Sequence, residues 1–363
     1  MPIHLILRVE LMWQPFIYNL NYMNNKAIFD KKNVLVIGGA GFIGSHLCDE
    51  LIKNSKVICI DNFSSGDEKN IDHLLSNPNF RFIRHDMSEP INFKEFFELD
   101  SFKIEFQGIQ EVYNLACPTT PIHFQKNRIA NLLANSIAVK NALDLAIKYQ
   151  SKFLHFSSSV VYGSREADNT LVSEDYLGAV DMLSERCSYD EGKRFSESMV
   201  KTYKDVYGLD AKIVRVFRIY GPRMALDRGN MLPDFISHAL DNSDLLIYGT
   251  KDFSSSFCFI NDCINGVMKL MESDLFGPIN IGSDQDINIT EVAEKIISIL
   301  GSTSKITYAD NLMFMTPLRL PDISRARDLL GWMPLVKIEA GLEKTIDNLR
   351  ADKNVKRIGY NPV

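Results

Sequence analysis

Between residue 33 and about residue 217, short apolar runs alternate with longer stretches in which apolar residues recur at helical spacing. The short runs predict buried strands, and the helical spacing predicts amphipathic helices between them. Strands that alternate with helices favour a parallel sheet covered by helices on both faces. The predicted strands are residues 34–39, 57–61, 80–86, 111–116, 152–159 and 211–217, and the predicted helices are residues 43–54, 127–149 and 189–206.

Beyond about residue 217 this rhythm loosens, because glycine and proline interrupt the apolar runs. Helices are predicted at 231–241, 261–273 and 290–300. Thr290 followed by Glu291 marks a helix start, and Gly301 marks its end. We therefore expect a smaller second lobe over residues 217–350, with some of its chain returning to the first domain.

The two ends of the chain are predicted to lie outside this fold, as an N-terminal extension (1–32) and a C-terminal tail (351–363). The first 32 residues are apolar, but Arg8, Glu10 and Pro15 interrupt the run and no basic segment precedes it. This pattern is typical of neither a signal peptide nor a membrane span.

The charge of the 363-residue chain restricts its partners. A formal net charge of −6 disfavours a protein whose task is to hold nucleic acid or an anionic membrane surface, since both need a basic face. The six cysteines lack CxxC spacing, which favours reduced thiols and a cytoplasmic protein. The seven histidines show no ligand spacing, so no metal site is predicted.

A glycine-rich turn, GGAGFIGSHL, follows the first predicted strand and opens a helix. In this context Gly38 permits a tight turn, Gly41 permits close approach of a pyrophosphate, and Gly44 permits close packing of helix on strand. The helix N-terminus offers N–H donors to the anion. Asp61 ends the next strand, where its carboxylate suits ribose hydroxyls and repels a 2′-phosphate, so the pattern favours NAD over NADP.

Tyr189 and Lys193 lie four positions apart on a predicted helix, so both can face one ligand. An ammonium near a phenol stabilises the phenolate and lowers the pKa of the tyrosine, which suits proton removal from an alcohol. Ser158, at the end of a predicted strand, can hydrogen-bond the same alcohol. By itself Tyr-x-x-x-Lys is common on solvated helical turns, but its position downstream of the glycine turn favours a catalytic pair.

These motifs, with NLACPTTP (114–121), SSSVVYG (157–163), YDEGKR (189–194), IYGPRM (219–224) and RLPDISRARDLLGW (319–332), resemble the extended short-chain dehydrogenase/reductase family that acts on nucleotide sugars. The resemblance extends from about residue 33 to residue 350 and is greatest to UDP-glucuronate decarboxylases. It implies an α/β fold with a Rossmann-type doubly wound parallel sheet in an NAD-binding domain (33–216), and a smaller C-terminal substrate-binding lobe.

The resemblance also implies roles for individual residues. Tyr189 would remove the proton of the sugar C4 hydroxyl, Lys193 would bind the nicotinamide ribose, and Ser158 would orient the hydroxyl. The implied NAD-binding residues are Gly38, Gly41, Phe42, Ile43, Gly44, Asp61, Asn62, Asp86, Met87, Leu115, Ala116, Tyr189 and Lys193. The implied substrate-binding residues are Pro118, Thr119, Ser159, Arg218, Arg223, Tyr248 and Arg319, for a nucleotide sugar that is expected to be UDP-linked. Helices 127–149 and 189–206 would pair in a homodimer.

The sequence departs from the family pattern at three positions. Val160 occupies the place of a glutamate that serves the decarboxylases and dehydratases as an acid or base. Ser255 occupies the place of an arginine, and Arg218 occupies the place of an asparagine. Residues 91–110 form a longer connection, which is predicted to be a surface excursion away from the site.

These departures leave the machinery for C4 oxidation intact and weaken the later steps of the reaction. A UDP-glucuronate decarboxylase is the first expectation, because the keto group at C4 itself assists loss of CO₂. A nucleotide-sugar 4-epimerase is the second, and NMLPDF (230–235) resembles an epimerase nucleotide loop. A 4,6-dehydratase would depend most on the missing glutamate. A catalytically reduced homologue that only binds NAD or a nucleotide sugar is the remaining alternative.

Overall fold

The computed structural model describes residues 31–119, 125–165, 171–226, 228–310 and 317–357. The chain divides into two units, Met1–Asp30 and Lys31–Val363, and all the described residues belong to the second unit. The predicted N-terminal extension therefore lies outside the described residues, apart from residues 31 and 32. The same holds for residues 358–363 of the predicted tail, whereas residues 351–357 belong to the last helix.

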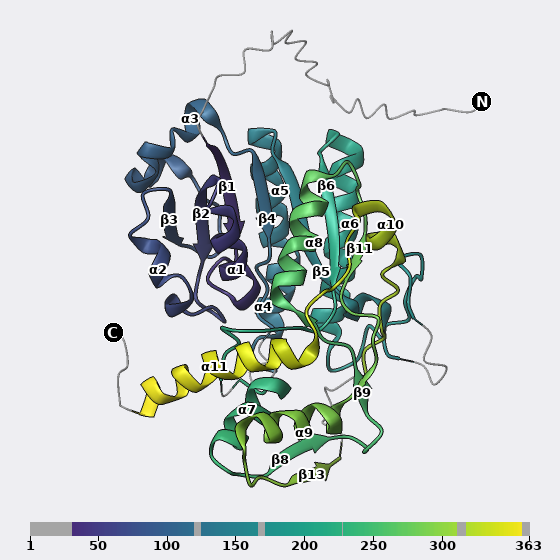
Figure 1. Ribbon diagram of the computed structural model, residues 1–363. Helices are drawn as coiled ribbons and strands as arrows, with labels where there is room; N and C mark the ends of the chain where they lie inside the picture. Colours follow the sequence, from purple (N-terminus) through teal and green to yellow (C-terminus); the bar gives the residue numbers. More distant parts are fainter. Residues whose placement is uncertain (1–30, 120–124, 166–170, 227, 311–316, 358–363) are drawn as a thin grey trace, which may run out of the picture. The chain divides into compact units, whose positions relative to one another are not determined.

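A seven-stranded parallel sheet forms the centre of the described chain (Figure 1). Its order, β11-β6-β5-β4-β1-β2-β3, places β1 and β4 side by side, and the chain winds outward from this pair in both directions. This confirms the expected α/β fold with a Rossmann-type doubly wound sheet, in which ligands bind beyond the carboxyl ends of the central strands. The strands are β1 (Lys32–Ile37), β2 (Ser55–Asp61), β3 (Phe80–Arg84), β4 (Glu111–Asn114), β5 (Lys152–Ser158), β6 (Ala211–Val216) and β11 (Ile279–Ile281).

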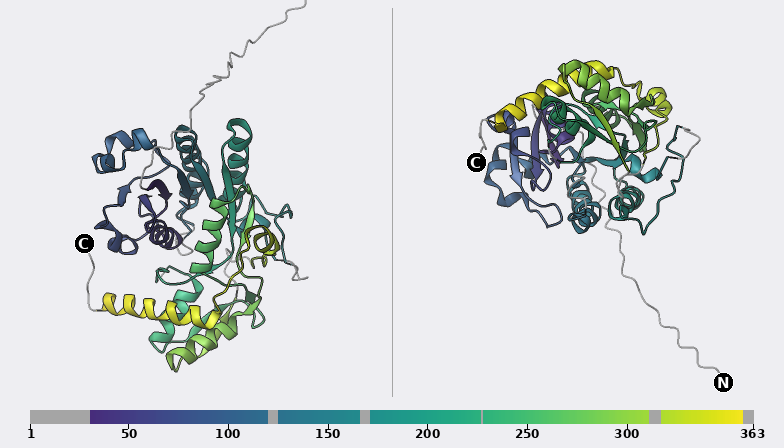
Figure 2. Two further views of the ribbon diagram at one scale, coloured as in Figure 1. Left: turned by 45° about the horizontal axis from the view of Figure 1, so that its top comes forward. Right: turned by 90° about the horizontal axis from the view of Figure 1, so that it is seen from below.

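Helices cover both faces of this sheet because its strands carry buried apolar side chains on both sides. Val34 and Val36 of β1 pack in one core cluster, and Leu35 and Ile37 pack in the other. The right view of Figure 2 shows the blue-green helices on one side of the sheet and the green and yellow helices on the other. The first face is covered by α1 (Phe42–Leu51) and α8 (Ile260–Glu272), and the second by α5 (Ile137–Tyr149) and α6 (Cys187–Tyr207), with α4 (Arg128–Asn135) packed on α5 and α6.

The helix predicted over residues 127–149 is two helices, α4 and α5, that are separated at Ser136. The backbone of Ser136 lies outside the helical region (φ −123°, ψ −82°), and its hydroxyl donates a hydrogen bond to the Leu132 carbonyl at 2.6 Å. A serine side chain that binds the backbone in this way competes with the helical ladder. The continuous helix expected from the apolar spacing was therefore wrong at this residue.

The segment predicted as a surface excursion is folded into the second core cluster. Residues 91–110 form the short 3₁₀ helices η2 (Phe93–Glu95) and η3 (Phe97–Phe102) and the short helix α3 (Ile104–Gln107). Phe93 and Phe102 are buried there, whereas Phe97 and Phe106 are 78% and 87% exposed. Only part of the segment is therefore a surface excursion, because some of its aromatic residues face the core.

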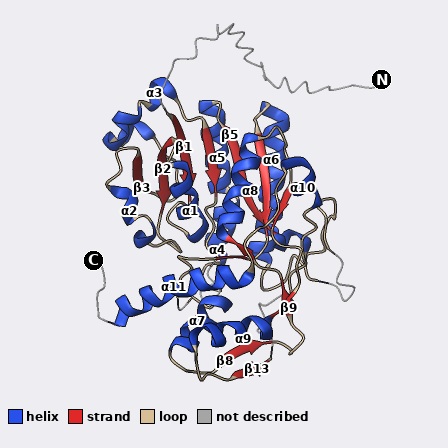
Figure 3. Ribbon diagram, viewed as in Figure 1, coloured by secondary structure: helices blue, strands red, loops and turns tan. Residues whose placement is uncertain are grey.

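The C-terminal part combines small two-stranded sheets with helices, as Figure 3 shows at the lower edge of the view. Its chain returns to the large sheet as β11, which pairs with β6. The other helices of this part are α7 (Met231–Leu240), α9 (Ile289–Leu300), α10 (Ser324–Leu330) and α11 (Ile338–Arg357). Its strand pairs are β7 (Ile219–Tyr220) with β10 (Cys258–Phe259), β8 (Leu245–Tyr248) with β13 (Ile306–Ala309), and β9 (Ser254–Ser255) with β12 (Ile287–Asn288). The remaining elements, which precede this part in the chain, are α2 (Asp72–Leu75) and the 3₁₀ helices η1 (Glu68–Asn70) and η5 (Ser159–Tyr162).

Candidate active site

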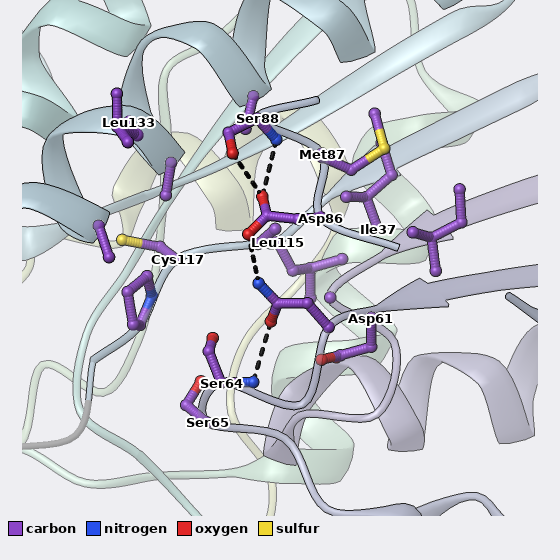
Figure 4. A pocket seen from close by; sticks show the side chains of 18 of the residues that line it. Ile37, Asp61, Ser64, Ser65, Asp86, Met87, Ser88, Leu115, Cys117 and Leu133 are labelled. Carbon is purple, nitrogen blue, oxygen red and sulfur yellow. Dashed lines mark hydrogen bonds between the residues drawn. The ribbon is translucent and has the colours of Figure 1, made fainter. Parts of the chain in front are cut away.

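A cavity of about 230 Å³ lies beyond the carboxyl ends of β1, β2 and β4 (Figure 4). A second cavity of about 450 Å³ lies beyond β5 and β6, and Leu115 and Cys117 line both of them. The first is lined by Gly38, Asp61, Asn62, Asp86, Met87, Leu115, Ala116 and Pro118 among others. The second is lined by Gly41, Phe42, Ile43, Gly44, Leu115, Thr119, Ser158, Ser159, Tyr189, Lys193, Arg218 and Arg223 among others.

Two of the predicted substrate residues are absent from the described linings of these cavities. Tyr248 ends β8 and pairs with Ala309 of β13. Arg319 is buried, its guanidinium lies 4.6 Å from the ring centroid of Tyr176, and its Nη2 donates to the Tyr176 hydroxyl at 3.2 Å. The structure therefore does not bring these two residues together with the rest of the predicted site.

The glycine turn has the geometry that a dinucleotide needs. Gly38 has φ +82°, and a Cβ there would lie 2.9 Å from the Ala116 nitrogen. A Cβ on Gly44 would lie 2.2 Å from the Gly38 carbonyl oxygen, so only glycine lets α1 approach the turn. Gly41 is the N-cap of α1, lines the second cavity and receives no side-chain cap. The open helix N-terminus fits an anionic group such as a pyrophosphate.

The first cavity has an ordered acidic rim. The Asp61 carboxylate accepts hydrogen bonds from the N–H groups of Ala40 at 3.0 Å and Phe63 at 2.8 Å, and burial raises the pKa of its carboxyl. The Asn62 amide donates to Asp86 at 2.9 Å. Figure 4 shows Ser88 bonded to the same carboxylate. Burial raises the pKa of Asp86, but hydrogen bonds from Ser88 and Asn62 outweigh it and the net shift is downward. These carboxylates are acceptors suited to ribose and adenine donors.

Ser158, Tyr189 and Lys193 come together at the second cavity. Ser158 ends β5, and its hydroxyl is near enough to the Tyr189 phenol to lower the pKa of that phenol. Tyr189 and Lys193 lie in the first two turns of α6. Lys193 is only 4% exposed, and its ammonium donates to the Phe156 carbonyl at 2.8 Å. The predicted trio therefore shares one cavity with the glycine turn.

Burial, followed by the nearby Cys117, raises the pKa of Tyr189 above its usual value, while the Ser158 hydrogen bond and the Arg186 charge lower it less. Burial also lowers the pKa of Lys193, whose ammonium is directed at a carbonyl. The expectation that Lys193 makes this phenol acidic is therefore wrong for the polypeptide by itself, because desolvation outweighs the charges around it.

The three departures from the family pattern are distinguished by their positions. Val160 is 4% exposed and lines the second cavity, so a hydrocarbon faces the ligand space where a carboxylate was expected. Ser255 is buried in β9, outside the described lining. Arg218 lines the cavity. Relative to the family pattern, the chain therefore lacks a cation at position 255 and has an additional cation at position 218.

Several lining residues were not found from the sequence. Arg186, Arg228 and Phe257 line the second cavity, and Cys117 lies between the two cavities. Arg186 precedes Tyr189 by three positions at the N-terminus of α6 and pairs with Asp190 at 3.1 Å. Its position one helical turn before the tyrosine is a signal that the sequence offered.

Residues 34–282 match the model of the NAD dependent epimerase/dehydratase family. The chain belongs to this family. The epimerase/dehydratase match covers the glycine turn, the Ser158–Tyr189–Lys193 trio and both cavities' central strands. Helices in the described residues are too short or too polar to span a lipid bilayer.

Curated relatives of this epimerase/dehydratase family member include UDP-glucuronic acid decarboxylases. The chain is 36% identical over 324 residues to UDP-glucuronic acid decarboxylase 1 of Xenopus tropicalis, a match that covers 89% of this chain and 73% of the relative. It is also 36% identical over 329 residues to UDP-glucuronic acid decarboxylase 6 of Arabidopsis thaliana, covering 90% and 91%.

Solved structures of epimerases have the same fold. The UDP-glucuronic acid 4-epimerase of Bacillus cereus, in complex with UDP-glucuronic acid and NAD, matches with a TM-score of 0.76 and 28% identity, covering 88% of this chain and 99% of that one. The UDP-N-acetylglucosamine 4-epimerase of Methanobrevibacter ruminantium, in complex with UDP-N-acetylmuramic acid, matches with a TM-score of 0.76 and 27% identity, covering 89% and 100%.

Proposed function

We propose that this protein binds NAD and a UDP-sugar and oxidises the sugar at C4, with UDP-glucuronate decarboxylation as its reaction. The observation that supports this most directly is that Ser158, Tyr189 and Lys193 line a cavity that also contains the glycine turn. Residues 33–216 would hold NAD, and residues 217–350 would bind most of the nucleotide sugar.

The chain offers NAD an anion site and a ribose site. The uncapped N-terminus of α1, with Phe42, Ile43 and Gly44 in its first turn, would hold the pyrophosphate. Asp61 would accept hydrogen bonds from the adenosine ribose, and Asn62 and Asp86 would face the adenine end. When bound, NAD supplies reversible two-electron oxidation of the sugar carbon.

Tyr189 would take the proton of the C4 hydroxyl. Because burial raises its pKa, the phenol is protonated at neutral pH in the polypeptide by itself, and it needs positive charge close by to act as a base. Arg186 already lowers this pKa, and Lys193 lies one helical turn away. Ser158, which lines the same cavity, would align the substrate hydroxyl with the phenol.

Val160 favours decarboxylation over dehydration. A ketone at C4 is β to the carboxylate carried by C5, so it accepts the electron pair released when the bond to CO₂ breaks, and no protein acid is needed for that bond cleavage. Dehydration requires removal of the C5 proton and expulsion of the C6 hydroxyl, and a valine can transfer no proton. The 36% identity to UDP-glucuronic acid decarboxylases supports the same choice.

A 4-epimerase is the second candidate. Epimerisation requires the oxidised sugar to rotate within the site, so that the hydride returns to its opposite face. This step needs no carboxylate at position 160. The structural similarity to a UDP-glucuronic acid 4-epimerase at 28% identity favours it, and Asn230, Met231 and Leu232 of the expected epimerase-like loop line the second cavity.

A homodimer through α4 and α6 is also proposed. Ile129 of α4 and Phe195 of α6 are 68% and 53% exposed, and Leu132 of α4 is 46% exposed. Exposed apolar side chains on adjacent helices are typical of an interface between subunits. Light scattering after size-exclusion chromatography would measure the mass directly.

Product analysis tests the proposed reaction. The purified protein would be incubated with NAD and, separately, with UDP-glucuronate, UDP-glucose and UDP-N-acetylglucosamine, and the products would be identified by mass and NMR. We expect loss of CO₂ from UDP-glucuronate. A product of unchanged mass and inverted C4 would support the epimerase, and binding without turnover of any sugar would support the catalytically reduced homologue.

Replacement of Tyr189 by phenylalanine tests the base. We expect Tyr189→Phe to slow turnover by a factor on the order of 10²–10⁴ while the affinity for the nucleotide sugar is retained. Tyr207→Phe is the matched control, since Tyr207 ends the same helix and is 58% exposed. If Tyr189→Phe and Tyr207→Phe both turned over at the wild-type rate, Tyr189 would not be the base.

A further inference from the structure

Arg218 has a backbone conformation that arginine rarely adopts. It lies two residues beyond Val216, the last residue of β6, which pairs with Ser158 at the end of β5. Its carbonyl accepts a hydrogen bond from the Cys258 N–H at 3.2 Å, and its φ is +25°, in the left-handed region. Asparagine adopts that region more easily than arginine. The family's asparagine thus suits this backbone, and an arginine here needs another reason.

The side chain of Arg218 reaches the second cavity and lacks an anionic partner among the described residues. Its Nε is shielded from solvent and forms no hydrogen bond within the described part of the chain, where no carboxylate lies within ion-pair distance of it either. The guanidinium lies 5.9 Å from the ring centroid of Phe257. Burial and the neighbouring Arg186 lower its pKa to about 10, so it is still charged at neutral pH.

Arg223 of the same cavity differs from Arg218 in this respect. The Arg223 guanidinium pairs with Asp49 at 2.7 Å, and its backbone N–H donates to Asn348 at 2.7 Å. Its Nη1, like the Nε of Arg218, is buried without a hydrogen bond, but its charge has a carboxylate partner in Asp49. A buried cation without a counter-charge is costly, and a bound anion removes that cost. Of these two arginines, Arg218 is the one whose charge an anionic ligand would balance.

The position of Arg218 favours an anion on the sugar over the diphosphate. It follows the strand beside Ser158, and Arg186, which lies close enough to lower the pKa of Arg218, also lowers the pKa of Tyr189. The charge of Arg218 is thus placed near the group proposed to act on the sugar ring. A guanidinium can donate two parallel hydrogen bonds to a carboxylate, whereas the hydroxyl of Ser255 cannot supply this paired arrangement.

We propose that Arg218 binds the carboxylate of a uronic acid and makes the site selective for UDP-uronates. This inference rests on the proposed function, since it concerns the sugar bound at the same cavity. It assigns to Arg218 the cationic role that the family pattern gives to the position of Ser255, and it places the cation just beyond β6, the strand that lies beside β5.

The test compares two ligands that share the nucleotide and the diphosphate. Binding of UDP-glucuronate and of UDP-xylose, which lacks the carboxylate, would be measured by titration calorimetry with the NAD-loaded protein in a Tyr189→Phe background, so that the ligand is not turned over during the titration. We expect Arg218→Asn to weaken UDP-glucuronate about 10- to 100-fold, the loss typical of a hydrogen-bonded charge, and to leave UDP-xylose unchanged. Arg218→Lys should keep part of the preference, because it retains the charge without the two-pronged geometry.

The controls separate a local effect from a general one. Arg327→Gln removes an exposed positive charge of α10 outside the cavity lining and should change neither affinity. Thermal melting should show Arg218→Asn at least as stable as the wild type, since asparagine tolerates the left-handed backbone. Equal weakening of both ligands would assign Arg218 to the diphosphate and overturn the proposal, as would unchanged binding of both. If the proposed function were wrong but this inference right, the wild-type protein would turn over no sugar and would still bind UDP-glucuronate in preference to UDP-xylose.

Discussion

His155 and Lys193 are buried polar side chains, and the half-buried Tyr189 lines the second cavity together with Lys193. His155 is 1% exposed, and its ring bonds Ser196 at 2.8 Å and Asn114 at 3.3 Å. Burial lowers the pKa of His155 well below its ordinary value of 6.5, and the charge of Lys193 lowers it further. At each of these three residues burial favours the neutral form. The proposed proton transfer at Tyr189 thus depends on positive charge that a bound ligand or Arg186 brings close.

His155 makes the stability of the fold depend on pH. Its folded-state pKa is lower than its unfolded-state pKa, so the unfolded chain binds more protons below about pH 6.5. Its contribution is complete above that pH and is lost as the pH falls. We expect the free energy of unfolding, measured by urea titration, to fall between pH 7 and pH 5 by up to about 1.4 kcal/mol per pH unit from this residue.

The variant His155→Gln isolates this contribution. It should be less stable than the wild type at pH 7 and lose less stability on acidification. Part of the slope should persist, because burial also lowers the pKa of His46. The raised carboxyl pKa values of Asp61 and Glu174 act in the opposite sense. An identical slope in wild type and variant would show that His155 is protonated in the folded state.

At the scale of elements, the turn between β1 and α1 serves both the packing of the helix and the accessibility of its N-terminus. Gly44 lets the helix pack on the turn, and Gly41 leaves the helix N-terminus accessible from the cavity. The first requirement belongs to folding and the second to ligand binding. Alanine substitutions at the two glycines should therefore have different consequences.

Gly44→Ala should destabilise the protein with or without NAD, by about 1–3 kcal/mol or more, because its Cβ would lie 2.2 Å from the Gly38 carbonyl oxygen. Gly41→Ala should leave the stability of the NAD-free protein nearly unchanged, since φ −73° and ψ 175° suit alanine and the nearest contact is 3.3 Å. It should nevertheless abolish the rise in melting temperature that NAD produces. Thermal melts with and without NAD measure both effects, and equal behaviour of the two variants would contradict the division of roles.

The elements that the sequence predicts best are those whose pattern is local. Six strands of the large sheet and helices such as α1, α6 and α9 follow from apolar periodicity and from Gly301 as a helix end. The break at Ser136 was not predicted, because a backbone bend between two apolar stretches leaves the helical spacing nearly unchanged. The seventh strand, β11, is only three residues long and is defined by its pairing with β6, which no local pattern reveals.

The candidate site shows the same limit. The glycine turn and the Ser158–Tyr189–Lys193 trio were found because their spacing is fixed along one turn, one strand end or one helix. The direction of the Arg218 side chain depends on how β6 is placed against β5, and Arg186 was missed although it lies one turn before Tyr189. The pKa of Tyr189 could not be read from the sequence, because desolvation depends on everything that surrounds the phenol.

At the scale of the described molecule, the C-terminal part and the large sheet share one core. The cluster that contains Val36 of β1 and Leu47 of α1 also contains Phe235 of α7 and Ile346 of α11. Trp332 lies in this cluster, is 2% exposed and donates its indole N–H to the Asp262 carbonyl at 2.9 Å. A core that crosses from one part to the other couples their stability.

This shared core predicts cooperative unfolding of residues 31–357. Trp332 packs against Gly266 of α8, where a Cβ would lie 2.9 Å from the indole nitrogen, so its fluorescence reports on the junction of α8 with the C-terminal chain. In a Trp13→Phe background, urea unfolding followed by this fluorescence and by far-ultraviolet circular dichroism should give coincident transitions, as a two-state process requires. If the fluorescence changed at a lower urea concentration than the dichroism, the C-terminal part would unfold first. The cavity between β5, β6 and α7 would then be lost before the sheet that holds the glycine turn.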